Sequence, residues 1–164
     1  MSSWFLILAV LALVSLSNGA PVLARLVLGD RLRQPVDGGH RLGDRRRALG
    51  ASKTVIGLAA ALLVTMAGGL LLGFDWWIGL LIGVAAMAGD LASSFVKRRL
   101  GRPPNAEVPL LDELPEAVLP VLAVAVPLGL DWLDGLLIVA AFVFIHAILD
   151  RPLRWIRRRL GAAR

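Results

Sequence analysis

Residues 76–96 read WWIGLLIGVAAMAGDLASSFV, an apolar block in which Asp90 is the one charged residue. A helix that crosses the hydrocarbon core of a bilayer needs about 20 predominantly apolar residues, so this block predicts a transmembrane helix. The whole chain of 164 residues is 57% hydrophobic and 18% charged, with a mean hydropathy of +0.74. A soluble domain this small needs more polar surface than that. The composition therefore predicts an all-α polytopic membrane protein.

Four other apolar blocks bring the expected number of transmembrane helices to five, in a single membrane domain covering residues 1–164. The expected spans are 3–28, 55–73, 76–96, 114–130 and 132–149. Because the fourth block contains Pro120 and Pro127, we expect a broken helix there, with neighbouring helices satisfying the freed carbonyls. The first block has the length of a secretory signal but lacks a preceding cluster of positive charge, so we interpret it as a retained first span.

The charged residues divide between the two ends of these spans. All 18 Lys and Arg residues lie within or beside the loops 29–54 and 97–113 and the tail 150–164. The turns at the opposite end carry no cation, and their charged residues are Asp75, Asp131 and Asp134. By the positive-inside rule, the N-terminus lies outside, and the basic loops and the C-terminus lie in the cytoplasm, at the inner membrane. Tryptophans are expected at the outer interface, at Trp76, Trp77 and Trp132.

The net charge of +6 is accounted for by the positive-inside orientation and by binding to phosphate-bearing lipids or ligands, so we expect no nucleic-acid partner. The chain has no Cys, which excludes disulfides and thiolate metal sites. The sequence also lacks a Ser/His/Asp order and an HExxH motif, so hydrolase chemistry has little support. His146 and Asp150 form an i, i+4 pair to which we assign a structural or interfacial role.

Asp90 is the clearest candidate for a functional residue, because a charge inside an apolar span costs roughly 2.5 to 3.5 kcal/mol on insertion scales. Helical spacing places Asp90, Ser93 or Ser94, and Lys97 on one face. A carboxylate can hold Mg²⁺ together with substrate phosphates, while Lys97 and Arg98 hold further phosphate oxygens. Two simpler interpretations stay open. Asp90 can be a buried acid paired with a neighbouring Lys or with hydroxyls, and the cations can be ordinary membrane anchors.

A second acidic cluster, Leu111-Asp112-Glu113-Leu114-Pro115-Glu116, precedes the fourth span. Acidic residues at a helix start complement the helix dipole, which is an alternative explanation for Glu113 and Glu116. For Asp112 we favour a ligand role, because with Asp90 it provides the second carboxylate of a metal-phosphate site at the inner membrane face.

The long basic loop carries a third group of candidates. Gly38-Gly39 lets the backbone approach a ligand, and Ser52-Lys53-Thr54 opens a helix with a capping hydroxyl, free N–H groups and a cation, which suits a phosphate. The segment is not a P-loop, and the loop is equally interpreted as a lipid-facing connector. In the first span, Asn18 lies beside Pro21, where its amide either bonds the freed carbonyls or faces the cavity.

Taken in order, these motifs resemble the CDP-archaeol synthase family, more closely its shorter bacterial members, which are related to the phosphatidate cytidylyltransferases. The matching strings are NxxP at 18–21, PxDGG at 35–39, GxSKT at 50–54, GDxxxSFxKRRxG at 89–101 and LD at 111–112. The resemblance implies a five-span enzyme that uses Mg²⁺ to join CTP to a membrane lipid phosphate of the phosphatidic or archaetidic acid type. The products are a CDP-activated lipid and pyrophosphate.

The same resemblance implies roles for individual residues. Asp90 and Asp112 hold the metal and, with Lys97, form the catalytic set. The implied substrate-binding residues are Asn18, Asp37, Gly38, Gly39, Lys53, Ser94 and Arg98. The active site faces the cytoplasm.

Two positions depart from the family pattern. Archaeal members continue LD as LDQLD, whereas Pro115 replaces the second aspartate here, and Ile56 stands where an arginine is common. A competing hypothesis is a non-catalytic membrane protein that binds anionic lipid or a partner through its basic loops. A CDP-alcohol phosphotransferase is a weaker alternative, because the long DG…AR…G…D…D pattern of that family is missing.

Overall fold

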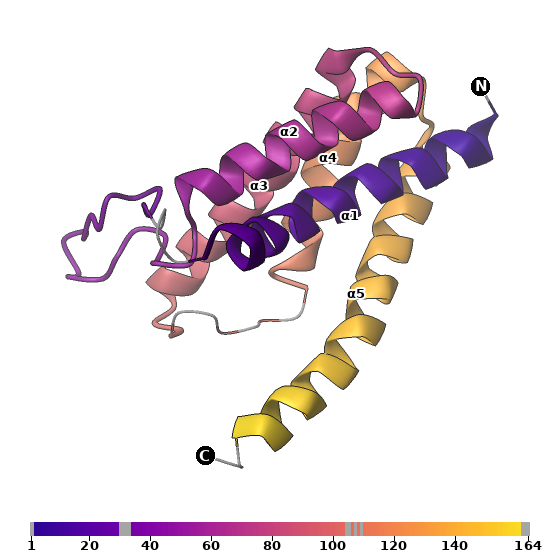
Figure 1. The fold of residues 1–164 in the computed structure, drawn as a ribbon. Coiled ribbons are helices and arrows are strands. Elements are labelled where there is room, and N and C mark those ends of the chain that lie inside the picture. The colour runs from indigo at the N-terminus through magenta and orange to yellow at the C-terminus, as the bar shows by residue number, and fades with distance from the viewer. Residues whose placement is uncertain (1, 30–33, 104–105, 107, 109, 162–164) are drawn as a thin grey trace.

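The computed structural model describes residues 2–29, 34–103, 106, 108 and 110–161, with side chains up to residue 148. This part of the chain is all-helical, as predicted, apart from isolated β-bridges in the loop between the first two helices (Figure 1). Its helices are α1 (Ser3–Leu28), α2 (Val55–Leu71), α3 (Trp76–Arg99), α4 (Glu113–Leu128) and α5 (Trp132–Gly161).

The helix ends differ from the predicted spans in four of the five helices. α2 stops two residues early, because Gly73 adopts a positive φ of 81° that no helix continues. α3 runs on through the Lys97–Arg99 cations to Arg99, where basic side chains complement the helix dipole. α4 begins one residue before the predicted span 114–130 and ends two residues before its end. α5 continues into the basic tail as far as Gly161.

The break predicted in the fourth span is absent, since α4 is continuous through both of its prolines. Pro120 is fully buried, so packing against neighbouring helices holds the backbone at the point where its N–H is missing. Pro127 falls in the last turn, and Gly129 then ends the helix in the left-handed conformation. α1 likewise passes through Pro21 without interruption.

By length and composition, α1 and α3 are apolar and long enough to cross a membrane, and α2 and the 132–148 part of α5 are shorter apolar helices. Large apolar side chains are exposed on several helices, among them Leu71 at 88% and Val126 at 90%. A surface this apolar fits contact with lipid better than contact with water.

Glycines bring the helices into close contact along α3. A Cβ added at Gly79 would lie 2.3 Å from the Thr65 carbonyl oxygen of α2, and one at Gly89 would lie 2.3 Å from the Pro115 carbonyl oxygen of α4. Small residues that let backbones approach are the usual contact of membrane helices. α3 is therefore fixed between α2 and α4, with α1 packed across them.

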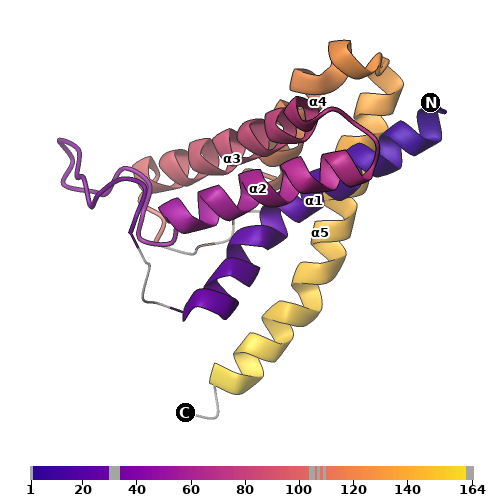
Figure 2. The same ribbon diagram turned by 45° about the horizontal axis from the view of Figure 1, so that its top comes forward.

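The core lies toward the end of the bundle that holds the N-terminus, and the polar residues lie toward the other end. The hydrophobic core is formed by buried apolar side chains from α1, α3, α4 and α5, including Leu13, Ile82, Val124, Ile138 and Phe142. The loop 34–54 lies at the opposite end, beyond the start of α2 and beside the end of α3 (Figures 1 and 2). The C-terminal half of α5 diverges from the other helices in both views.

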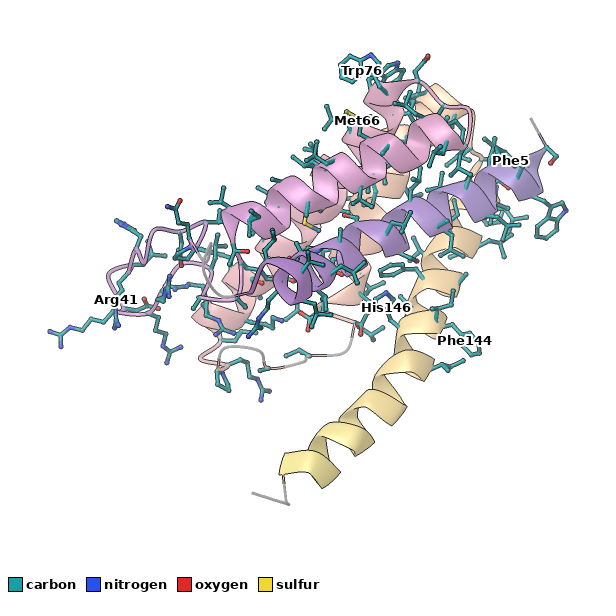
Figure 3. The ribbon with its side chains drawn as sticks, in the orientation of Figure 1. Phe5, Arg41, Met66, Trp76, Phe144 and His146 are labelled. Carbon is teal, nitrogen blue, oxygen red and sulfur yellow. The ribbon has the colours of Figure 1, made fainter. Side chains whose placement is uncertain are left out.

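The tryptophans predicted at the outer interface and the predicted His146–Asp150 pair can be compared with the structure. Trp76 lies at the end of the bundle away from the basic loops (Figure 3), and the side chains of Trp76, Trp77 and Trp132 are all exposed. The His146 ring stacks on Phe142 with centroids 4.3 Å apart, which gives it a packing role. The side chains of Asp150 and of the basic tail lie outside the described residues.

Candidate functional site

The loop between α1 and α2 is organised around the carboxylate of Asp37. Its oxygens accept hydrogen bonds from Arg47 Nη2 at 2.6 Å and from the backbone N–H groups of Gly39, Leu49 and Gly50 at 3.0 to 3.1 Å. The side chain is only 2% exposed. Burial raises the pKa of a carboxyl group, but these four bonds outweigh it and hold the pKa of Asp37 well below its ordinary value of 3.8.

Arginine side chains fasten this loop to the end of α3. Arg46 Nη1 donates to the carbonyl oxygens of Arg98 and Arg99 at 3.4 and 3.1 Å, groups that the helix end leaves without intrahelical partners. In return, Arg99 pairs with Asp44 at 2.7 Å and donates to the Arg47 carbonyl at 2.7 Å. The loop therefore holds a defined position over the polar end of the bundle.

Lys53 lies where this loop enters α2, and it points at α3. Its Nζ lies 2.6 Å from Asp90 Oδ2 and contacts Oδ1 as well, so the ammonium group bridges both carboxylate oxygens. Thr54 caps α2 by accepting a hydrogen bond from the Gly57 N–H at 3.2 Å. The cap fixes the backbone beside Lys53. Both members of the ion pair are partly buried, with side-chain exposures of 24% for Lys53 and 17% for Asp90.

A second carboxyl group lies against Asp90. Glu116, in the first turn of α4, is within hydrogen-bonding contact of Asp90 and within electrostatic reach of Asp112. Its Oε2 accepts a hydrogen bond from Asn18 Nδ2 at 2.7 Å, so the amide of α1 orients a carboxyl group of α4. Gly89, next to Asp90, closely approaches the carbonyl of Pro115, next to Glu116, so both acids lie at the contact between α3 and α4.

The third polar pair joins the end of α3 to the start of α4. Lys97 Nζ lies 2.6 Å from Asp112 Oδ1 and also donates to the Ala106 carbonyl at 3.1 Å. Asp112 Oδ2 accepts from the Val108 N–H at 3.0 Å. Lys97 thus pairs with Asp112, and Asp90 pairs with Lys53.

Two adjoining hollows meet at Lys53. The first, which we call the polar cleft, has a volume of about 200 Å³ and is lined by Leu49, Ser52, Lys53, Ser94, Lys97, Arg98, Ala106 and Asp112. The second, the lateral groove, has a volume of about 90 Å³ and is lined by Pro21, Arg25, Gly29, Val36, Ser52, Lys53, Thr54, Ile56, Gly57, Leu58, Met87, Asp90 and Leu91. Ser52 and Lys53 line both.

The structure brings most of the predicted site residues together. Lys53, Ser94, Lys97, Arg98 and Asp112 line the polar cleft, and Asp90 lies beyond Lys53 in the lateral groove. Asn18 joins the cluster through Glu116.

The remaining predicted residues lie apart from both hollows. Neither hollow is lined by Asp37, Gly38 or Gly39. Asp37 contacts the polar cleft indirectly, because it accepts a hydrogen bond from the N–H of Leu49, which lines that cleft. Of the two serines, Ser94 lines the polar cleft, whereas the Ser93 hydroxyl bonds back to the Asp90 carbonyl at 2.9 Å.

Glu116 is the site residue that the sequence interpretation missed, because a helix-capping role explained it equally well. Its i, i+4 spacing from Asp112 was the available signal, since that spacing places both acids on one side of the α4 start. Only the contact with Asn18 and Asp90 separates the two explanations.

Asp90 and Asp112 are carboxylates of the kind that binds a magnesium ion together with a polyphosphate. Among the described residues, no group of three or more His, Cys, Asp or Glu side chains forms a preformed metal cage. Mg²⁺ is usually bound by one or two carboxylates together with substrate phosphates and water. Asp90 and Asp112 are both oxygen donors near the polar cleft, and each already has a lysine that neutralises it.

The fold and the site together define an all-helical protein with apolar helices suited to a membrane and a cluster of charged side chains at one end of its bundle. A family model described as CarS-like CDP-archaeol synthase matches residues 4–161. The chain belongs to this family, whose members are intramembrane enzymes of lipid activation.

Individual relatives agree with that family. A CDP-archaeol synthase of Aeropyrum pernix is 41% identical over 132 residues, which are 77% of this chain and 72% of the relative. A CDP-archaeol synthase of Methanopyrus kandleri is 41% identical over 87 residues, 49% of this chain, and the match spans about half (50%) of that relative's length. A solved structure of an intramembrane enzyme for archaeal membrane lipid biosynthesis superposes with a TM-score of 0.74 at 33% identity, covering 87% of this chain and 90% of that one.

Proposed function

We propose that this protein is a CTP-dependent cytidylyltransferase that converts a membrane lipid phosphate to a CDP-activated lipid and releases pyrophosphate. The observation that carries the proposal is the position of Lys53, which lines both the polar cleft and the lateral groove and pairs with Asp90. Phosphate groups that enter by these two routes meet at one ammonium group. A binding protein for a single ligand has no need of two routes.

The two routes suit two chemically different substrates. The polar cleft presents Lys97, Arg98 and a buried serine, Ser94, which suit the triphosphate of CTP. The lateral groove combines Lys53 with apolar side chains such as Ile56, Leu58 and Met87. Such a lining suits a lipid whose phosphate lies beside its acyl or isoprenoid chains. The apolar Ile56 here replaces the arginine common in the family.

In the proposed topology all five helices span the membrane, with the N-terminus outside and the C-terminus in the cytoplasm, at the inner membrane. The basic loop 34–54 and the basic last turn of α3 lie at one end of the bundle, which supports this orientation. The polar cleft then faces the cytoplasm, where CTP is dissolved, and the lateral groove opens at the depth of the lipid phosphates.

The reaction needs positioning and charge neutralisation more than a base. A phosphate oxygen of the lipid forms a bond to the α-phosphorus of CTP, the bond from that phosphorus to the bridging oxygen of the β-phosphate breaks, and pyrophosphate leaves with those electrons. The lipid phosphate is ionised at neutral pH, so no proton has to be removed first. Lys53 holds the attacking phosphate against the α-phosphate, and Lys97 with Arg98 holds the leaving pyrophosphate.

Asp90 and Asp112 are the proposed ligands of Mg²⁺, and Glu116 lies next to them. When bound, the ion supplies positive charge for the triphosphate oxygens. Asn18 keeps Glu116 in place, and Asp37 with Gly38 and Gly39 shapes the loop that carries Leu49 and Gly50 to the nucleotide pocket.

The test is a substrate screen with the purified protein in liposomes. CTP, other nucleoside triphosphates, phosphatidic acid and archaetidic acid are combined with Mg²⁺, and pyrophosphate release and lipid products are measured. The Aeropyrum pernix relative serves as the positive control. We expect release only with CTP and a lipid phosphate together. If this protein forms no product while the relative is active, and if CTP with Mg²⁺ does not raise its unfolding temperature, the non-catalytic alternative is favoured.

A further inference from the structure

A third hollow, next to the polar cleft, is lined almost wholly by arginines. This arginine cleft has a volume of about 290 Å³, and its lining residues are Arg41, Arg45, Arg46, Arg47, Arg98 and Arg102 with Gly50 and Gly101. Arg98 and the neighbouring residues Leu49 and Gly50 separate it from the polar cleft. No role in the proposed reaction has been assigned to Arg41, Arg45 or Arg102.

The backbone is shaped to gather these cations. Gly50 and Gly101 have φ values of 112° and 72°, and a Cβ on Gly101 would lie 2.8 Å from Arg46 Nη1. Arg45 itself has a φ of 60°, which is unfavourable for a residue with a side chain and tends to persist at functional positions. Figure 3 shows Arg41 projecting from this loop beyond the helix ends.

Among the described residues, the arginine cleft carries more positive than negative charge, although Asp44 lies within electrostatic reach of Arg46. Among the described side chains, Arg47 is the lining arginine with a carboxylate partner, Asp37. Arg46 and Arg98 donate to backbone carbonyls, which carry no net charge. Like charges at this density repel, so the arrangement favours a multiply charged anion.

Arg98, which lines both the arginine cleft and the polar cleft, indicates a ligand at the boundary between them. The residue is 7% exposed, and its buried Nε has no hydrogen-bond partner in the described part of the chain. A buried donor without a partner costs free energy that an incoming acceptor restores. Guanidinium groups match the oxygens of phosphate by paired hydrogen bonds.

We propose that the arginine cleft is a second anion site that binds phosphate groups beside the polar cleft, separately from the substrates of the reaction. Two sources offer that chemistry: the headgroup of an anionic phospholipid and a free polyphosphate such as pyrophosphate. The inference concerns binding alone and does not depend on turnover.

The chain has no native cysteine, so a Leu42→Cys substitution places a single fluorophore between Arg41 and Arg45. In one arm, the labelled protein in neutral detergent is titrated with pyrophosphate. In the other arm, nanodiscs of phosphatidylcholine are compared with nanodiscs that also contain phosphatidylglycerol. The same measurements are made on the variant Arg45→Ala/Arg102→Ala. The charge-matched control is Arg157→Ala/Arg158→Ala in the basic tail.

We expect a fluorescence response to one probe, weakened at least about tenfold in affinity by Arg45→Ala/Arg102→Ala and kept by the control. A response to pyrophosphate identifies a free phosphate, and a response only to phosphatidylglycerol identifies a headgroup. No response to either probe, or equal responses in the native and Arg45→Ala/Arg102→Ala proteins, overturns the proposal. If that variant fails to fold, Arg41→Ala, at an exposed position, gives the same test.

Discussion

The ammonium group of Lys53 lies 2.6 Å from Asp90 Oδ2 and so connects the start of α2 to the middle of the polar face of α3. The contact is long-range in sequence and partly buried, and it places a cation and an acid where two hollows meet. Pairing of this kind compensates the two groups inside the bundle until a substrate phosphate or a metal competes for either partner.

Asp90→Asn tests the central acid of the site. The substitution keeps the size of the side chain but removes its charge, so Lys53 loses its ion-pair partner and the proposed metal loses a ligand. We expect pyrophosphate release to fall at least about 100-fold. Asp75→Asn, at the exposed residue before α3, is the matched control and should keep full activity. Unchanged turnover in Asp90→Asn would remove Asp90 from the mechanism.

Lys97 and Asp112 should behave as a unit. Lys97→Met leaves Asp112 partly buried without its cation and removes a donor to the leaving pyrophosphate, so we expect the KM for CTP to rise at least about tenfold. The double variant Lys97→Met/Asp112→Asn should lose less than the sum of the two single effects. Steady-state kinetics of the four proteins give the coupling, and simple additivity would contradict a shared role.

Glu116→Gln tests the carboxyl group of Glu116 separately from its hydrogen bond to Asn18. Glutamine can still accept from Asn18, so the fold should be kept, while the carboxyl group beside Asp90 is replaced by an amide that cannot act as a carboxylate ligand. We expect a higher Mg²⁺ concentration for half-maximal activity and a smaller Mg²⁺-CTP shift in unfolding temperature. Glu113→Gln makes the same change from a carboxyl group to an amide on the same helix turn, at a residue that accepts a hydrogen bond from the Leu110 N–H, and it is the control. Equal Mg²⁺ responses in both variants would show that Glu116 only caps α4.

The extent of the helices was predictable from the sequence because each apolar block is long and ends at charged or glycine residues. α1 begins and ends at the predicted residues, and α3 needed only the addition of its basic last turn. The break predicted at Pro120 was wrong. The packing that holds a buried proline in a helix involves residues of other helices, which periodicity within α4 does not reveal.

The members of the site were easier to predict than their partners. Asp90 and Lys97 share a face of α3, as their spacing indicates, yet each pairs with a residue from another segment, Lys53 and Asp112. Those pairings depend on how closely α3 approaches its neighbours, which is set by Gly79 and Gly89. The gathering of six arginines around Gly50 and Gly101 depends likewise on loop conformation and was not predicted.

Gly89→Ala tests whether close helix contact positions the site. The added Cβ would meet the Pro115 carbonyl at 2.3 Å, so α4 has to move away. We expect a loss of about 1 to 3 kcal/mol in the free energy of unfolding, together with lower activity because Glu116 moves from Asp90. Gly19→Ala, in α1 with nothing within 4 Å, should be neutral or slightly stabilising. Denaturation in detergent measures both, and equal stabilities would contradict the model of a tight α3–α4 contact.

The part of the α1–α2 loop that is bonded to Asp37 should lose its structure in acid. Because the folded pKa of Asp37 lies below 3.8, its ionised form is the one that the fold stabilises, and that contribution is complete above 3.8 and lost as the pH falls through the lower folded value. Hydrogen exchange should therefore show the amides of Leu49 and Gly50 losing protection in this acid range while amides within α3 stay protected. Asp37→Asn removes the charge that Arg47 and these amides bind, so it should show low protection of the two amides at neutral pH with little further change in acid. Native-like protection in Asp37→Asn would mean that the loop is held by other contacts, such as those of Arg46 and Arg99.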